Sequence, residues 1–355
     1  MKNAMTISTP ITILCLVLFF AFTLLTYWTL LKKQEISNCM PYSQEMSQNK
    51  ENEMISSGYY VASYLTEGDY HNITGDSHIE ENFTIETPDF LLNQCKYRSE
   101  CLNGRVSIDN RLRYSTKHKI VGCLAENDMT KVVETMTCYL YDQKMFNRAK
   151  TFLKYNEMKK FCIVVSEERS IPKIWADFSN QNIDINSVLH YAVIQDPLQR
   201  FVGKYIDYCL RSQAFQNSTH CLSCHHNITC FLGNLHSHLL QHKNSSLAYE
   251  FSPQSWYCDF NRHLQNFKIV KYEEFHKDLP NVFMQIKEFG SKNGVTQDDI
   301  DNVHVDFEKE VWKEDKVADN LKEFFVRKIK SNKKLLELFL KVYHIDYISF
   351  GFGLE

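Results

Sequence analysis

An excess of positive charge is the first thing that this sequence lacks. Its 355 residues contain 40 lysines and arginines against 43 aspartates and glutamates, a formal net charge of −3 at pH 7. This balance argues against nucleic acid as the main ligand, because no surplus of cations is available to neutralise phosphates, although it leaves room for a local basic pocket. Internal repeats and long low-complexity tracts are also absent. The 44% hydrophobic and 23% charged content suits one good-sized globular domain.

Charge is missing altogether from one N-terminal segment. Residues 11–31, ITILCLVLFFAFTLLTYWTLL, are 21 consecutive uncharged residues, enough helix to cross a hydrocarbon core of ~30 Å. The apolar stretch is longer than that of a cleaved signal peptide, and no small-residue cleavage site is evident. We therefore predict a transmembrane signal anchor at 11–31, preceded by a short cytoplasmic tail at 1–10 and followed by a polar lumenal stem at 32–105.

The orientation of the anchor rests on opposing signals. Lys2 and the amino terminus lie on one side, and Lys32 and Lys33 lie on the other, which weakly favours a cytosolic body. Eleven cysteines and five Asn-x-Ser/Thr sequons beyond the anchor favour the oxidising secretory lumen, where N-glycans are added. The second set outweighs two lysines, so we predict a single-pass type II Golgi membrane glycoprotein. The sequons are at Asn72, Asn82, Asn217, Asn227 and Asn244.

Five cysteines are grouped in the second half of the chain, with His220, His225 and His226 nearby. The group admits two interpretations, a zinc site or disulfides. Disulfides suit an oxidising lumen, so we predict them and no metal. Because eleven is an odd number, at least one lumenal cysteine is unpaired or bonds another chain, and Cys39 is well placed for a disulfide-linked dimer. The five candidate disulfide cysteines are Cys209, Cys221, Cys224, Cys230 and Cys258.

From residue 106 the chain has the pattern of a folded domain, which we place at 106–355. Short apolar runs predict buried strands, and apolar residues at helical spacing predict helices. Strands that alternate with helices indicate an α/β domain with a mostly parallel sheet. The predicted strands are 119–125, 161–166, 191–195 and 267–271, and the predicted helices are 130–145, 280–289 and 320–343, the last interrupted near residues 331–332.

Two strand-to-helix corners of this domain are candidate ligand sites. In parallel sheets, ligands bind at the carboxyl ends of the strands, where helix N-terminal amides and the helix dipole favour an anion. The first corner is 125–131 (AENDMTK) and the second is 195–200 (QDPLQR). On spacing alone, ordinary turns with Asp or Thr as helix caps explain both corners better than a ligand site does.

Several ordered segments of the chain resemble one known family. They are YAVIQDPLQRFVGKYIDYC (191–209), the pair Cys221-x-x-Cys224, PQSWYCDF (253–260), LKVYHIDYISFGF (340–352) and HKIVGCLAENDMTKVVETMTCYLYD (118–142). Together they look like the membrane-bound carbohydrate sulfotransferases, in a divergent branch of the chondroitin/HNK-type group. The resemblance spans roughly residues 105–353, which is the whole predicted domain.

This resemblance implies a P-loop nucleotide-kinase-like α/β fold that binds 3′-phosphoadenosine 5′-phosphosulfate (PAPS) and transfers its sulfuryl group to a hydroxyl of a glycan or proteoglycan. It assigns the first corner to the 5′-phosphosulfate and the second to the 3′-phosphate. Sulfuryl transfer resembles phosphoryl transfer, in which a fixed cation stabilises charge on the leaving oxygen. The positions carried over are Asn127, Asp128, Met129, Thr130 and Lys131 in the first corner, and Gln195, Asp196, Pro197, Arg200, Gly203 and Lys204 in the second.

Several of these positions depart from the pattern of the family. Gln195 stands where the family has Arg, Gly203 where it has Ser, and Asn127 where it has Lys. Glu126 and Asp128 add negative charge, and a carboxylate roughly 4 Å from a phosphate costs on the order of 4 kcal/mol at an effective dielectric of ~20. Two functions therefore stay open: a carbohydrate O-sulfotransferase with degenerate donor-site motifs, or a catalytically inactive, lumenal glycan-binding or interaction protein.

Two lysines offer compensation for the missing cations. Lys131 follows the first corner, Lys204 lies beside Gly203, and Thr130 retains a hydroxyl. Either lysine could turn towards a phosphate. The alternative, which we favour, is that both lysines belong to a solvated helix surface.

The general base is not identified by the sequence. His304, in the segment IDNVHVDF, is a weak candidate for activating the acceptor hydroxyl, and Asp207 and Asp259 are no better supported. Trp256 and Tyr257 suit stacking on a sugar ring, but burial in a core explains an aromatic pair equally well.

Overall fold

The computed structural model describes most of the predicted domain and few residues before it. The predicted anchor and tail, nearly all of the stem, Cys39, the sequons at Asn72, Asn82, Asn217 and Asn244, and the corner residues Asn127 and Asp128 lie outside the described residues. Among the helices that are described, none has both the length and the apolar character needed to cross a bilayer. The described residues are 70, 73–74, 95, 100–104, 108, 110–126, 129–152, 166–211, 220–241, 245–309 and 316–353.

A five-stranded mixed sheet forms the centre of this part of the chain. Its strand order is β3-β1-β2-β4-β5. β2, β4 and β5 are mutually parallel, whereas β1 pairs antiparallel with both β2 and β3. The expectation of a mostly parallel sheet is therefore right for β2, β4 and β5 and wrong for the two pairings of β1. The strands are β1 (Leu112–Ser115), β2 (Ile120–Cys123), β3 (Glu167–Glu168), β4 (Leu189–Gln195) and β5 (Phe267–Tyr272).

The strands found from sequence are the buried parallel ones. The apolar runs at 119–125, 191–195 and 267–271 correspond to β2, β4 and β5. β1 was missed because it carries Arg113, which is fully buried and pairs with Glu134 at 2.6 Å and Glu167 at 3.1 Å. The strand predicted at 161–166 lies outside the described residues except for its last residue.

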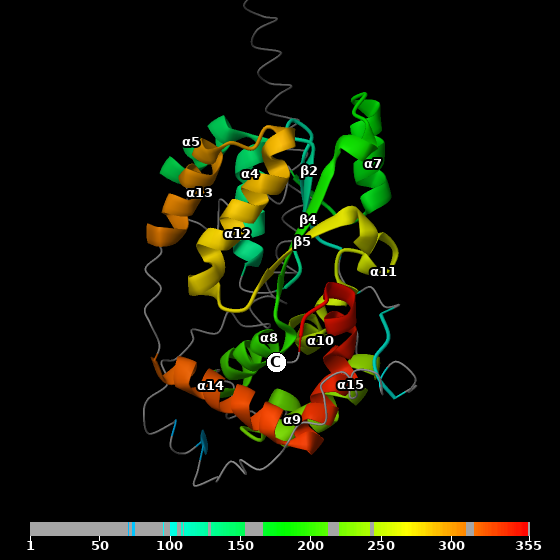
Figure 1. Ribbon diagram of the computed structural model, residues 1–355, viewed down its shortest axis with the longest axis vertical. Helices are drawn as coiled ribbons and strands as arrows, with labels where there is room; N and C mark the ends of the chain where they lie inside the picture. The colour runs from blue at the N-terminus through cyan, green and yellow to red at the C-terminus, as the bar shows by residue number, and fades with distance from the viewer. Residues whose placement is uncertain are drawn as a thin grey trace, which may run out of the picture. The chain divides into compact units, whose positions relative to one another are not determined.

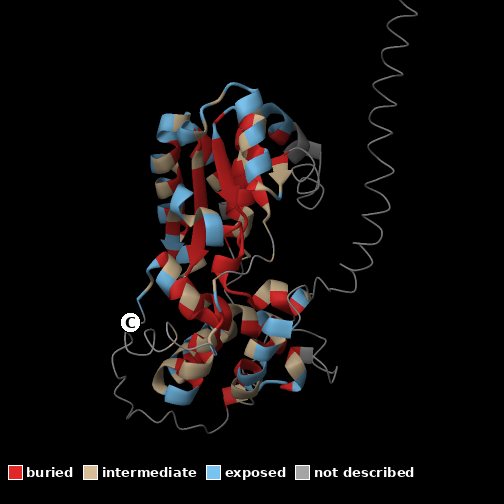
Figure 2. Cartoon of the chain, turned by 90° about the vertical axis from the view of Figure 1, so that its right-hand side faces the viewer, coloured by how far each residue is buried: buried red, intermediate tan, exposed pale blue. Residues whose placement is uncertain are grey.

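Helices cover both faces of the sheet (Figure 1). α4 (Thr130–Tyr141) and α12 (Phe275–Gly290) pack on one face, where Ile120 and Tyr191 point. α7 (Ile171–Asn180) packs on the other face, where Val121 and Ala192 point. Neighbouring residues of a strand face opposite sides, so β2 and β4 supply both cores, and Figure 2 shows the strands buried between the helix layers.

A third core forms among helices that follow β4. Phe201 of α8 lies at its centre, with ring centroids 6.3 Å from Phe231, 5.7 Å from Phe339 and 5.6 Å from Tyr343. The described helices of eight or more residues are α4 (Thr130–Tyr141), α5 (Gln143–Phe152), α7 (Ile171–Asn180), α8 (Pro197–Tyr205), α9 (Ile228–Gln241), α12 (Phe275–Gly290), α13 (Gln297–Lys309), α14 (Lys316–Ser331) and α15 (Lys333–Phe350), and the shorter ones are α10 (Ser246–Phe251) and α11 (Phe260–His263).

Helix boundaries differ from the sequence predictions where a side chain caps the backbone. The segment 320–343 is two helices, and Asn332 at the break accepts a bond from Leu335 N at 3.0 Å, as the predicted interruption requires. α12 begins five residues before Pro280, because Asp278 accepts bonds from Glu273 N and Glu274 N at 2.8 and 2.9 Å and thereby starts the helix early. The predicted helix 130–145 is divided at Asp142 into α4 and α5.

All five candidate cysteines take part in disulfides. Cys258 bonds Cys123 at the end of β2, so a bridge closes a sequence separation of 135 residues. Cys138 is also disulfide-bonded, to a cysteine outside the described residues. The zinc interpretation fails because these sulfurs are engaged with one another. The four described pairs are Cys95–Cys101, Cys123–Cys258, Cys209–Cys221 and Cys224–Cys230.

Replacing Gly122 with Ala tests the close approach of β2 to α4. A Cβ at this position would lie 2.7 Å from Val133 Cγ1 and 2.9 Å from Thr137 Oγ1. We expect Gly122→Ala to lower the free energy of unfolding by about 1–3 kcal/mol in denaturant titrations. Gly233→Ala on α9 is the control, because its Cβ meets nothing within 4 Å and the change should stabilise a helix by about 0.5–1 kcal/mol. Equal midpoints for Gly122→Ala and the unmodified protein would contradict this packing.

Candidate functional site

The two predicted corners lie side by side at one edge of the sheet. β2 and β4 are parallel neighbours, with Cys123 in register with Ala192, so both strands end at the same edge. α4 leaves the first corner and α8 leaves the second (Figure 1). Arg200 Nε, on α8, donates to the carbonyl oxygen of Glu126 in the first corner at 2.6 Å. The corners are therefore positioned to share one ligand.

The side chain of Arg200 joins the two corners to the end of α10 (Ser246–Phe251). The residue is 2% exposed, and its other two nitrogens donate to Ser252 O at 2.9 Å and Glu250 O at 3.0 Å. All three nitrogens of the guanidinium are thus bonded to backbone carbonyls. Arg200 thus shapes the corners, since one N–H of each nitrogen is committed to the fold.

The first corner presents a helix N-terminus without an acid of its own. Met129, the residue before α4, contributes no side-chain cap, and the first turn of α4 contains no acidic residue. Thr130 Oγ1 donates to Ala125 O at 2.5 Å, and Met129 N donates to the hydroxyl of Tyr272 at 3.2 Å. Lys131 lies half-buried in that turn. The positive end of the helix dipole and one lysine suit an anion here.

In the second corner, the carboxylate of Asp196 occupies the N-terminus of α8. Asp196 Oδ1 accepts bonds from Leu198 N at 3.0 Å and Gln199 N at 2.9 Å, so it caps α8 at the amides that an anion would use. Burial raises the pKa of Asp196 above its ordinary value, and the nearby charge of Glu273 adds to this effect. The backbone of Pro197 fits the first turn of the helix.

The side chain of Gln195 is buried and bonds to the backbone at the end of the neighbouring strand. The residue is 2% exposed, and its side-chain amide donates to the backbone oxygen of Glu273 at 3.1 Å. Its own backbone is bracketed by the side chain of Gln254, which accepts from Gln195 N at 3.0 Å and donates to Gln195 O at 2.7 Å. Gln195 therefore ties the end of β4 to the end of β5.

Gly203 and Lys204 lie where α8 passes the first corner. A Cβ on Gly203 would meet nothing within 4 Å, so space is open beside it. Lys204 is only 19% exposed and pairs with Glu250 at 2.8 Å and Glu126 at 3.7 Å. Glu126 also pairs with Arg111 at 3.0 Å. The interpretation of Lys204 as a solvated surface lysine is wrong, because two carboxylates hold it against the corner.

Asp346 supports the corners from α15 and was missed by the sequence analysis. Its carboxylate is fully buried and accepts bonds from Gln254 N at 2.7 Å and Ser255 N at 2.8 Å. Burial raises its pKa. The signal that could have found it is an acid on an otherwise apolar face of a helix, which requires buried partners.

The other candidate residues have structural surroundings. His304 of α13 lies edge-on against Phe283, with ring centroids 5.2 Å apart, a contact that does not link it to either corner. Asp207 is exposed and pairs with Arg211, and Asp259 lies 3.6 Å from His263.

Trp256 and Tyr257 are core residues, 1% and 0% exposed. Trp256 Nε1 donates to Asn103 O at 2.9 Å, and the Tyr257 hydroxyl donates to Tyr249 O. Stacking of this pair on a sugar is excluded by their burial.

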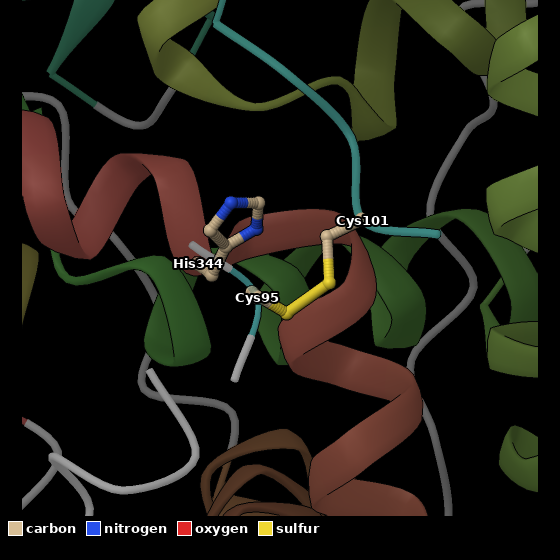
Figure 3. Close-up of side chains that lie close together, drawn as sticks. All are labelled: Cys95, Cys101 and His344. Atoms are coloured by element: carbon tan, nitrogen blue, oxygen red, sulfur yellow. A yellow bond between two sulfur atoms is a disulfide. The ribbon is translucent and has the colours of Figure 1, made fainter. Parts of the chain in front are cut away.

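One group of side chains in the described part of the chain has the spacing of metal ligands. Ligand atoms of Cys95, Cys101 and His344 lie within 4.8 Å of one another (Figure 3). The two sulfurs form a disulfide, so they are not thiolates that could bind an ion. Burial lowers the pKa of His344, whose Nδ1 lies 3.2 Å from Leu340 O. The group is a structural contact between the end of the predicted stem and α15.

Comparison with known proteins now defines the class. Residues 110–353 match the sequence profile of the Sulfotransferase family, which is more than half of the chain. The protein therefore belongs to the sulfotransferase family, and its α/β fold with a five-stranded mixed sheet is consistent with that membership. Membership implies PAPS as the sulfuryl donor. No solved structure matches the chain at a significant level.

Two relatives from Caenorhabditis elegans illustrate the distance within the family. The protein vep-2, named as a sulfotransferase, is 27% identical over 215 residues, which cover 59% of this chain and 66% of vep-2, slightly less than two thirds of its length. Carbohydrate sulfotransferase chst-1 is 24% identical over 265 residues, which cover 70% of this chain and 77% of chst-1. The chain is thus distantly related to carbohydrate sulfotransferases.

Replacing Asp196 with Asn tests the buried acid of the second corner. Since its pKa in the folded protein lies above the ordinary 3.8, the folded state binds this proton more tightly than the unfolded chain does. The contribution of Asp196 to stability therefore rises as the pH falls through the folded pKa towards 3.8, and is lost as the pH rises again. We expect the unfolding free energy of the unmodified protein to increase relative to that of Asp196→Asn as the pH falls from about 7 to about 4.

Asn keeps the capping oxygen, so the helix start is preserved in this variant. Denaturant titrations at several pH values measure the difference between the two proteins. A difference that stays flat, or that falls on acidification, would contradict a raised pKa for Asp196.

Proposed function

We propose that this protein is a carbohydrate O-sulfotransferase that transfers the sulfuryl group of PAPS to a hydroxyl of a glycan or proteoglycan. The observation that carries the proposal is that the two corners adjoin each other. At the first of them, α4 begins without an acidic residue in its first turn. Family membership supports PAPS as the donor, and the name of chst-1 supports a carbohydrate acceptor.

In this proposal the first corner holds the 5′-phosphosulfate. The N-terminus of α4 and Lys131 face the charge that builds on the leaving phosphate oxygen during sulfuryl transfer, and Thr130 holds the shape of the corner through its bond to Ala125 O. The second corner lies under the 3′-phosphate, with open space beside Gly203. The chain supplies binding and orientation for the transfer.

A second candidate function is a catalytically inactive, lumenal glycan-binding or interaction protein with the same fold. It is favoured by one specific observation: Gln195 and Arg200 are committed to backbone oxygens, and Lys204 is neutralised by Glu126 and Glu250. A corner without an available cation binds a phosphate weakly. Donor binding separates the two functions.

We also propose that the domain lies in the Golgi lumen, behind a single type II anchor at 11–31. Four disulfides among the described cysteines support an oxidising compartment. Asn227 is exposed at the start of α9, which leaves its sequon accessible. A disulfide-linked dimer through Cys39 stays a prediction.

Donor binding and transfer test the function directly. We expect calorimetry of the purified protein with 3′-phosphoadenosine 5′-phosphate to show binding, and radiolabelled PAPS to label a glycan mixture. Lys131→Ala should weaken binding about ten- to hundredfold through loss of a charge-assisted contact, whereas Lys144→Ala on the exposed face of α5 should leave it unchanged. Absence of binding by the unmodified protein would favour the inactive alternative.

Glycosylation at Asn227 tests the lumenal placement. Asn227 Oδ1 accepts a bond from Cys230 N at 3.0 Å, so it caps α9 while its amide nitrogen remains the site of glycan attachment. Thr229→Ala removes the sequon and keeps the cap. We expect this variant to migrate faster than the unmodified protein on gels by one glycan, and the difference to vanish after enzymatic deglycosylation. Identical mobility before deglycosylation would count against a glycan at this position.

A further inference from the structure

We propose that Lys204 is the phosphate-binding cation of the second corner, and that Glu126 and Glu250 hold it in place and compete with the nucleotide for it. The inference rests on the proposed function, because it concerns the donor nucleotide. It assigns a residue that replaces the missing guanidinium at position 195 and a pair of acids that set the affinity of the site.

The argument starts from what the other basic and polar groups of the corner already do. Arg200 directs its three nitrogens to carbonyl oxygens of two segments, the first corner and the end of α10. Gln195 donates to Glu273 O, and Asp196 takes the first amides of α8. These bonds are to backbone groups inside the fold, so a ligand cannot displace them without breaking the corner.

Lys204 differs because its described partners are side-chain carboxylates. Glu250 lies at 2.8 Å and Glu126 at 3.7 Å from its ammonium. The side chains of Glu126 and Glu250 are 21% and 32% exposed, so both reach solvent and can turn outward. A phosphate can therefore take the place of a carboxylate at this ammonium without any change in the backbone.

Space is open beside the residue that precedes Lys204 on α8. Lys204 follows Gly203, where a Cβ would meet nothing within 4 Å. The lysine also reaches the first corner through Glu126, so it lies at the junction of the two bends. A cation at this junction is within reach of a nucleotide that spans both.

The charges explain why the glutamates matter. Among the described residues, Glu126 pairs with Lys204 and Arg111, and Glu250 pairs with Lys204. A phosphate monoester carries about −1.5 to −2 charges at neutral pH, more than a single carboxylate, and therefore attracts an ammonium more strongly at the same distance. The displaced glutamates then repel it, so removal of either one should strengthen binding.

The experiment is calorimetry of the full-length protein with three probes: 3′-phosphoadenosine 5′-phosphate, adenosine 5′-monophosphate and adenosine 3′-monophosphate. We expect Lys204→Met to weaken the first about ten- to hundredfold, and Lys204→Arg to retain most of the affinity. Lys292→Met, at an exposed lysine of a distant turn, is the control. Lys204→Met should weaken binding of adenosine 3′-monophosphate and leave that of adenosine 5′-monophosphate unchanged, and the reverse result would overturn the assignment of Lys204 to the second corner.

Two further variants keep the inference separate from the proposed function. Glu126→Gln and Glu250→Gln should each tighten binding of the bisphosphate several-fold, whereas Glu288→Gln on α12 should not. Tight binding by the unmodified protein that is unaffected by Lys204→Met would overturn the inference and leave the transferase intact. Binding that appears only in the glutamate variants would support it and point to an inactive natural protein. No binding in any variant would overturn it.

Discussion

The bonds of Arg200 are the constraint on which the site depends. A buried guanidinium is stable only when its donors are satisfied, and here they reach the first corner, Ser252 and Glu250. The side chain thus joins two neighbouring strand ends to the segment that carries α10. Since the partners are backbone oxygens, the separation of the two corners is fixed by the fold itself, independent of any ligand.

The elements that could be predicted from the sequence are those whose cause is local. Buried apolar runs gave β2, β4 and β5, and the cap at Asn332 gave the break between α14 and α15. β1 escaped prediction because Arg113 becomes a core residue only through Glu134 and Glu167.

The candidate site shows the same difference between features with a local cause and features that depend on distant residues. The position of both corners follows from strand and helix patterns, and the family from ordered motifs. The environment of Lys204 does not, since its partner Glu250 is 46 residues away and no periodicity links them. Asp346 and Gln254 are 92 residues apart and meet only in the fold. Charges that look unfavourable along the chain, such as Glu126, are neutralised by residues brought in from other elements.

The bridge between Cys123 and Cys258 has a consequence for biogenesis. Cys123 ends β2 and leads directly into the first corner, yet its partner is synthesised 135 residues later. During translation the first corner is therefore made long before Cys258, and the bridge beside it forms only after Cys258 has emerged. Formation of this disulfide is thus a maturation step for the first corner. A cell that keeps its cysteines reduced would yield a protein that lacks the bridge between the end of β2 and Cys258.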